Sequence, residues 1–117
     1  MKTLVATVAL LLTSTIASAQ TVGGNYTVSG TNLNGSRYAG DATITLSSDY
    51  TCNIVWKTGS STSSGICMRD GNALAAGYEL NGKVGLVIYM IQGDGTLDGT
   101  WTIDGVNAFG TEILTPD

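Results

Sequence analysis

The chain has 117 residues, with 5 Lys and Arg, 9 Asp and Glu, no His and a formal net charge of −4. The absence of His excludes a Ser-His-Asp triad and imidazole metal sites, and the acidic balance excludes the basic surface that nucleic acid or an anionic membrane requires. Its 16 Gly and 1 Pro, with abundant Thr and Ser, favour one small all-β domain.

The N-terminal segment has the pattern of a bacterial signal peptide. Lys2 supplies a positive charge, residues 4–12 are apolar, and residues 17–19 (Ala-Ser-Ala) form a small-residue cleavage site. We therefore expect a signal peptide over 1–19 and a single all-β domain over 20–117, periplasmic or secreted, with no membrane span in the mature chain. Removal of Lys2 leaves 4 basic against 9 acidic residues, 4 minus 9, or a net charge of −5.

Turn signals divide the rest of the chain at regular intervals. Asn-Gly and Asp-Gly pairs favour type I′ hairpin turns, in which both central residues have positive φ. Such pairs occur at Asn34-Gly35, Asp70-Gly71, Asn81-Gly82, Asp94-Gly95 and Asp104-Gly105. The runs between them predict eight strands, near residues 24–31, 37–47, 50–58, 62–68, 73–80, 83–92, 96–103 and 106–114.

Alternating apolar residues support these strands, as in Ala42, Ile44 and Leu46. The run 83–92 is apolar on both faces, which suggests a strand covered on both sides. Sequential strands with short turns leave two unpaired edges unless the sheet closes. We therefore expect an all-β, eight-stranded antiparallel up-and-down meander closed into a barrel, with a twisted open sheet or a two-sheet sandwich as the alternative. Strand glycines favour a strongly curved sheet.

The two cysteines predict a register. If Gly59-Ser60 is a two-residue turn, Cys52 and Cys67 face each other across one hairpin, within disulfide range. An even number of cysteines in an exported chain favours a structural disulfide over two buried thiols. A redox-active pair is disfavoured, because the spacing is not C-x-x-C.

Turn glycines and aromatic residues recur over nearly the whole of residues 20–117. They are Asn34-Gly35-Ser36-x-Tyr38-x-Gly40, Trp56, Gly65-Ile66, Gly71-Asn72-x-Leu74, Val87-x-Tyr89, Asp94-Gly95-x-Leu97-x-Gly99-x-Trp101 and Gly110-Thr111-Glu112. In these residues the chain resembles a family of small exported proteobacterial β-proteins, some of which carry the label fibronectin-binding protein. The resemblance implies recognition of a matrix or envelope partner. The Cys52 and Cys67 pair departs from the family pattern and suggests a local stabiliser.

A second, fainter resemblance is to avidin-type biotin-binding barrels. The segment Asn32-Leu33-Asn34-Gly35-Ser36 resembles their first loop, and Leu97-x-Gly99-x-Trp101 resembles one of their strands. Avidins surround the ligand with several tryptophans, whereas this chain has only Trp56 and Trp101. A hairpin loop with ordinary Asn-Gly chemistry is therefore the preferred interpretation.

Carboxylates are the remaining candidates for chemistry. Asp94 with Asp98, or Glu79 with Glu112, could form an acid–base pair. The loop 94–98 has too few oxygens for calcium, which takes six to eight ligands. We expect no enzyme activity, no catalytic residue, no cofactor and no metal site.

Glu112 leaves two alternatives open. If the apolar residues of the last strand face the core, Glu112 is solvated, and this is the preferred interpretation. If the small residues face inward, Glu112 enters the barrel and must pair, with Arg37 or a tyrosine as partner.

The function that we expect is a non-enzymatic binding or interaction module that recognises a matrix or envelope partner at its surface. The alternatives are a carrier of a small apolar or amphipathic ligand inside the barrel, and an envelope stress protein or enzyme inhibitor. We expect a monomer or small oligomer whose protein or small-molecule partner the sequence does not identify. Possible ligand or partner contacts are Trp56, Trp101, Tyr38, Tyr89 and Glu112.

Overall fold

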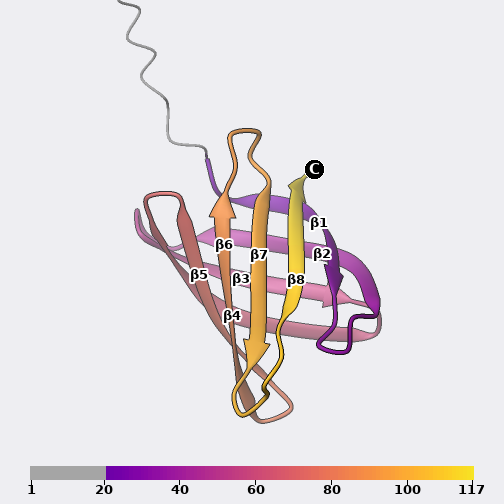
Figure 1. Cartoon of the computed structure of the whole chain (residues 1–117). Coiled ribbons are helices and arrows are strands. Elements are labelled where there is room, and N and C mark those ends of the chain that lie inside the picture. Colours follow the sequence, from indigo (N-terminus) through magenta and orange to yellow (C-terminus); the bar gives the residue numbers. More distant parts are fainter. Residues whose placement is uncertain (1–20) are drawn as a thin grey trace, which may run out of the picture.

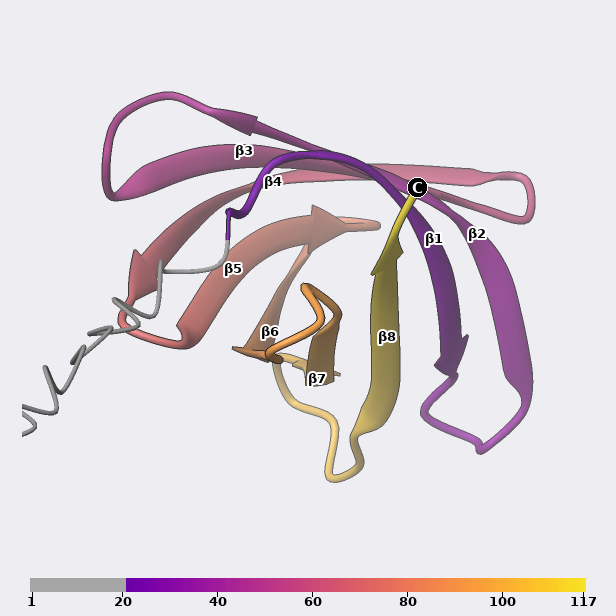
Figure 2. The same cartoon turned by 90° about the horizontal axis from the view of Figure 1, so that it is seen from above.

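The computed structural model describes residues 21–117 as a closed barrel of antiparallel strands (Figures 1 and 2). The expected signal peptide lies outside the described residues. The strands are β1 (Gly24–Thr31), β2 (Arg37–Leu46), β3 (Thr51–Thr58), β4 (Ser61–Asp70), β5 (Ala73–Leu80), β6 (Lys83–Ile91), β7 (Leu97–Ile103) and β8 (Gly110–Pro116). No helix in residues 21–117 has the length and apolar character to cross a membrane.

Closure removes both edges of the sheet. Each strand pairs with the next along the chain, and β8 returns to pair with β1 through six residue pairs. The predicted barrel is confirmed, and the open sheet and the sandwich are wrong. In Figure 1, β6, β7 and β8 run across β1 to β4, which lie behind them, as the strong coiling of a small barrel requires.

The last strand begins later than predicted, at Gly110 instead of residue 106. Residues 104–109 form an irregular connection, in which the Val106 amide donates to the Ile103 carbonyl at 3.1 Å. The Thr102 hydroxyl also donates to the Ala108 carbonyl at 2.6 Å. The Val106 amide and the Ala108 carbonyl are backbone groups that a strand over 106–109 would pair across the sheet. The first seven strands agree with the prediction to within two residues at each end.

The expected type I′ geometry holds at only one of the five pairs. Asn81 and Gly82 both have positive φ, 52° and 79°, and Asn81 is the only non-glycine residue with positive φ in the described chain. The loop 32–36 closes with a hydrogen bond from the Gly35 amide to the Asn32 carbonyl at 2.9 Å. The loop 92–96 has the matching bond at 3.0 Å. Both are longer hairpin loops with one left-handed glycine.

The predicted disulfide is confirmed. Cys52 and Cys67 are direct partners in the β3–β4 register, with a Cα–Cα distance of 4.9 Å and an S–S distance of 2.02 Å. A bridge over a loop of this length contributes about 3 kcal/mol to the free energy of unfolding in the chain-entropy model. The disulfide is consistent with an oxidising extracellular or periplasmic environment.

The interior of the barrel has two halves. At the end of the β2–β3, β4–β5 and β6–β7 connections, large apolar side chains fill the lumen. They include Tyr26, Ile44, Ile54, Leu74, Leu97 and Leu114, all 2% exposed or less. At the opposite end the inward side chains are mainly aromatic or small. The filled half therefore supplies the stability, and the other half is free to form a site.

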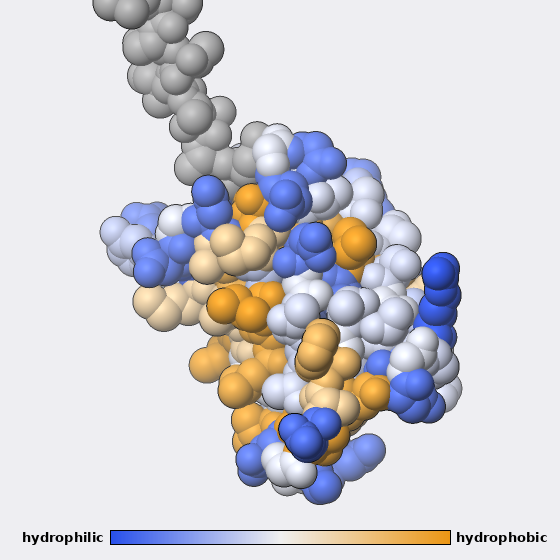
Figure 3. Space-filling view, in the orientation of Figure 1, coloured by the Kyte–Doolittle hydropathy of each residue, from blue (hydrophilic) through white to orange (hydrophobic). Residues whose placement is uncertain are grey.

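The outer surface of β6 is apolar and exposed. Val87 and Tyr89 face the lumen, whereas Leu86 and Ile88 are 60% and 52% exposed on the outside. The expectation of a strand covered on both sides is wrong for the described chain, because the cross-strand neighbours of Leu86 and Ile88 on β5 are only Gly77 and Ala75. Figure 3 shows apolar side chains gathered over this region. We call it the outer apolar face; its large residues are Ile66, Met68, Val84, Leu86, Ile88 and Met90.

Glycines opposite the inward aromatic residues determine where the rings lie. Each of four such residues has a glycine as its cross-strand partner: Tyr38 with Gly30, Tyr78 with Gly85, Tyr89 with Gly99, and Trp101 with Gly110. A Cβ at Gly99 would lie 2.5 Å from Cδ1 of Tyr89. The rings therefore pack directly over the backbone of the next strand.

Gly99→Ala tests this packing, because the fully buried Tyr89 ring cannot move away from the added methyl group. We expect the free energy of unfolding to fall by about 1–3 kcal/mol. The matched control is Gly77→Ala, where the nearest atom, Cδ2 of Leu86, would be 3.7 Å away. Urea unfolding measures both variants, and equal effects would contradict the account.

Candidate ligand-binding site

A cavity of about 370 Å³ opens at the end of the barrel that carries the β1–β2 and β3–β4 connections. Its walls are aromatic, formed by Tyr38, Trp56, Tyr78 and Trp101, and Glu112 also lines it. The Trp56 and Tyr78 rings meet edge to face at 5.1 Å between centroids, and the Tyr38 and Trp101 rings at 6.3 Å. Its rim is polar and includes Asn32 and residues 58–61.

Glu112 lies inside the barrel and is 6% exposed. Its Oε1 accepts a hydrogen bond from the Tyr38 hydroxyl at 2.7 Å. Its Oε2 accepts from Nε1 of Trp56 at 3.0 Å and from the Tyr89 hydroxyl. The preferred interpretation of a solvated Glu112 is wrong. Gly110, Glu112 and Leu114 face inward on β8, because Gly110 leaves the space that the Trp101 ring occupies.

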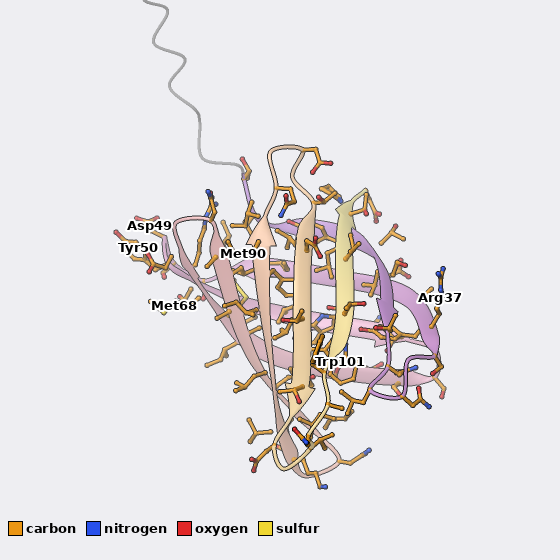
Figure 4. All side chains as sticks on the ribbon, viewed as in Figure 1. Arg37, Asp49, Tyr50, Met68, Met90 and Trp101 are labelled. Atoms are coloured by element: carbon orange, nitrogen blue, oxygen red, sulfur yellow. A yellow bond between two sulfur atoms is a disulfide. The ribbon has the colours of Figure 1, made fainter. Side chains whose placement is uncertain are left out.

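The sequence suggested Arg37 or a tyrosine as the partner of a buried Glu112, and in the structure the partners include two tyrosines, Tyr38 and Tyr89. Arg37 is exposed, and Figure 4 shows it at the edge of the barrel, away from Trp101 and the lumen. Three neutral donors from β2, β3 and β6 therefore hold a carboxylate of β8. Each hydrogen bond to a charged group contributes about 1.5–3 kcal/mol, which offsets the loss of hydration on burial.

The charge of Glu112 affects the tyrosines around it. Burial, followed by this negative charge, raises the pKa of Tyr78 to about 12. The same two causes raise the pKa values of Tyr38 and Tyr89 further. All three hydroxyls therefore remain protonated at neutral pH, and those of Tyr38 and Tyr89 donate to Glu112.

Trp101 differs from Trp56 in its hydrogen bonding. Its Nε1 is buried and makes no hydrogen bond to any of the described residues. An unpaired buried N–H is unfavourable by about 1–3 kcal/mol.

The structure brings together the five residues that the sequence suggested as contacts. Trp56, Trp101, Tyr38, Tyr89 and Glu112 all face the lumen, so they form no outer aromatic surface. Tyr78 and Ser63 also line the cavity and were missed. Tyr78 could have been found, since it shares its face of β5 with Leu74 and Ala76, which are buried.

Of the two carboxylate pairs that the sequence suggested, the structure separates Glu79 from Glu112, whereas Asp94 and Asp98 line one surface pocket. Glu79 is exposed on the outside of β5, so the barrel wall separates it from Glu112. Asp94 stabilises its own turn, where Oδ1 accepts from the amide and the hydroxyl of Thr96 at 3.0 and 2.7 Å. These two bonds lower the pKa of Asp94. No group of three or more metal-ligating side chains occurs in the described chain.

The loop that resembles avidins uses its polar groups within the turn. Oδ1 of Asn34 accepts from the amide and the hydroxyl of Ser36 at 3.0 and 2.7 Å, which repeats the geometry of Asp94 and Thr96. Asn32 donates to the Ser36 hydroxyl at 3.0 Å and also lines the cavity rim. Turn chemistry therefore accounts for the Asn34 and Ser36 side chains.

Comparison with known proteins finds similar solved structures. No family model and no curated protein matches the chain. A redesigned β-barrel aligns with a TM-score of 0.65 and 17% identity, over 86% of this chain and 94% of that chain. A mutant of the fluorescent protein UnaG aligns with a TM-score of 0.54 and 11% identity, over 81% of this chain and 95% of that chain. At these identities the comparisons show the fold alone.

Alkaline titration tests the electrostatic effect of Glu112. The folded-state pKa of Tyr78, about 12, lies above its ordinary value of 10.0. The fold therefore favours protonated Tyr78, and this stabilisation is complete below pH 10 and lost as the pH rises through 12. We expect Glu112→Gln to lower the tyrosinate absorbance midpoint assigned to Tyr78, because it removes the charge.

The absorbance change that belongs to Tyr78 is identified because it disappears from the titration curve of Tyr78→Phe. Glu79→Gln removes a carboxylate from the outer surface of the same strand and should leave this absorbance change unaltered. An identical Tyr78 midpoint in the wild type and in Glu112→Gln would contradict the account.

Proposed function

We propose that the protein is a non-catalytic binding barrel that holds a small ligand in the hollow half of its lumen. The observation that carries this proposal is the 370 Å³ cavity, with aromatic walls and the buried Glu112 at its base. Small-molecule sites are usually mostly apolar, span about 300–1,000 Å³, and have a few fixed polar groups. Among the sequence-based alternatives, this corresponds to the small-ligand carrier.

The construction of the barrel supports a preformed site. The filled half and the Cys52–Cys67 disulfide stabilise the fold without using the hollow half. The aromatic walls are held by packing over glycines and by hydrogen bonds to Glu112. A ligand therefore meets rings that are already in place, which reduces the entropy lost on binding.

A neutral apolar dye, N-phenyl-naphthylamine, tests this function. We expect it to bind in the lumen with enhanced emission and to quench the fluorescence of Trp56 and Trp101. Ser63→Trp should abolish binding, because Ser63 lines the cavity. Ser64→Trp is the matched control, since Ser64 is exposed on the outside of the same strand. Equal binding by both variants would place the dye elsewhere and overturn the proposal.

We propose, as a second function, that the outer apolar face recognises a protein surface of a matrix or envelope partner. Its six large side chains are each about half or more exposed and present on the order of 600 Å² of apolar surface, at the upper end for a monomer. The small residues Ala75 and Gly77 of β5 lie between the large side chains of β4 and β6. Exposed Glu79 and Asp98 lie opposite Val84 and Met90 at the border of the face, so the partner surface that fits it is apolar with a polar border.

Immobilised fibronectin is the probe that the family resemblance suggests for this second function. We expect the wild type to bind it and Leu86→Ser to lose most of that binding. Leu46→Ser is a close control, because Leu46 is 57% exposed on β2 and Leu86 is 60% exposed on β6. Absence of wild-type binding, or equal loss in both variants, would count against recognition by this face.

A further inference from the structure

We infer that the lumen selects a compact organic cation, such as a substituted ammonium ion, over neutral and anionic molecules of the same size. This inference rests on the proposed lumen-binding function and specifies its ligand class. Its basis is the direction of the hydrogen bonds around Glu112, together with the charges that line the cavity.

The strongest donors of the lumen are already in use. The hydroxyls of Tyr38 and Tyr89 and the indole N–H of Trp56 all point at the Glu112 carboxylate. The Trp101 N–H makes no hydrogen bond to the described residues, so it is the one strong donor left, and it is buried beside Gly110. A ligand that needs hydrogen-bond donors, such as a carboxylate or a phosphate, therefore finds few of them at the base of the cavity.

The groups left for a ligand near Glu112 are mainly ring faces and acceptor oxygens, and the side-chain donors of the rim are the Asn32 amide and neutral hydroxyls. The rings of Trp56, Tyr78, Tyr38 and Trp101 surround the cavity, and aromatic faces attract cations by about 0.5–2 kcal/mol each. The Tyr38 hydroxyl donates its proton to Glu112 and keeps lone pairs that can accept from an N–H, whereas the Tyr89 hydroxyl already accepts from the Trp56 N–H at 3.1 Å. Both features favour a positively charged group.

The net charge of the cavity lining also favours a cationic ligand. Glu112 is the only charged residue among the lining residues, and no Lys or Arg lies among them. Its hydrogen-bond partners are neutral, so its negative charge is stabilised but not cancelled. A ligand cation would neutralise it in a site of low dielectric constant, where such an interaction is stronger than in water. An anion would be repelled there.

The test compares two probes of nearly identical shape, benzyltrimethylammonium and its neutral carbon isostere, neopentylbenzene. We expect wild-type protein to bind the cation roughly tenfold more tightly, measured by quenching of tryptophan fluorescence. Glu112→Gln should bring the two affinities close together. Glu79→Gln removes an equal charge from the outer surface and should leave the ratio unchanged.

The wild-type comparison needs no variant, so it decides the matter even if Glu112→Gln fails to fold. Stronger or equal binding of the neutral isostere would overturn the cation inference and leave the lumen function intact, provided that Ser63→Trp abolishes that binding. Failure of both probes, with continued binding of N-phenyl-naphthylamine, would also overturn the inference alone. Failure of all three would overturn both proposals.

Discussion

Burial of one carboxylate constrains most of the hollow half of this barrel. An unpaired charge inside a protein is strongly unfavourable, so Glu112 must be surrounded by donors. The donors come from Tyr38 on β2, Trp56 on β3 and Tyr89 on β6, strands that are distant from β8 along the chain. Each donor side chain must therefore extend into the lumen at the level of the Glu112 carboxylate along the barrel axis. The carboxylate thus connects opposite walls of the barrel and prevents the aromatic side chains from filling the space above it.

Small residues make this arrangement possible. Rings that reach across a narrow barrel need room at the wall, and glycines supply it opposite Tyr38, Tyr78, Tyr89 and Trp101. The other half of the lumen needs no such room, because aliphatic side chains fill it. One barrel therefore combines a packed core, which holds the fold, with a preformed cavity, which is available for binding.

The fold followed from the sequence because its signals are local. Turn glycines, alternation and the Cys52–Cys67 register all depend on residues close together in the chain. The structure confirms the positions of the turns and the register, and it has type I′ geometry at one of the five turn pairs. The preferred prediction for Glu112, a solvated side chain, was wrong. The last strand carries apolar residues on both faces, so alternation alone does not indicate which face points into the barrel. Only the partner strands, with Gly110 opposite Trp101, decide it. The exposed face of β6 was unexpected for the same reason.

Hydrogen exchange of the Trp56 indole N–H, followed by nitrogen–proton NMR, tests the central claim most directly. The chain has two tryptophans, so the spectrum has two indole signals, and loss of one in Trp101→Phe assigns the other to Trp56. The account predicts that the Trp56 N–H, bonded to a buried carboxylate, is shifted downfield and exchanges only on global unfolding. Rapid exchange of this proton, while the backbone amides of β3 stay protected, would contradict the account.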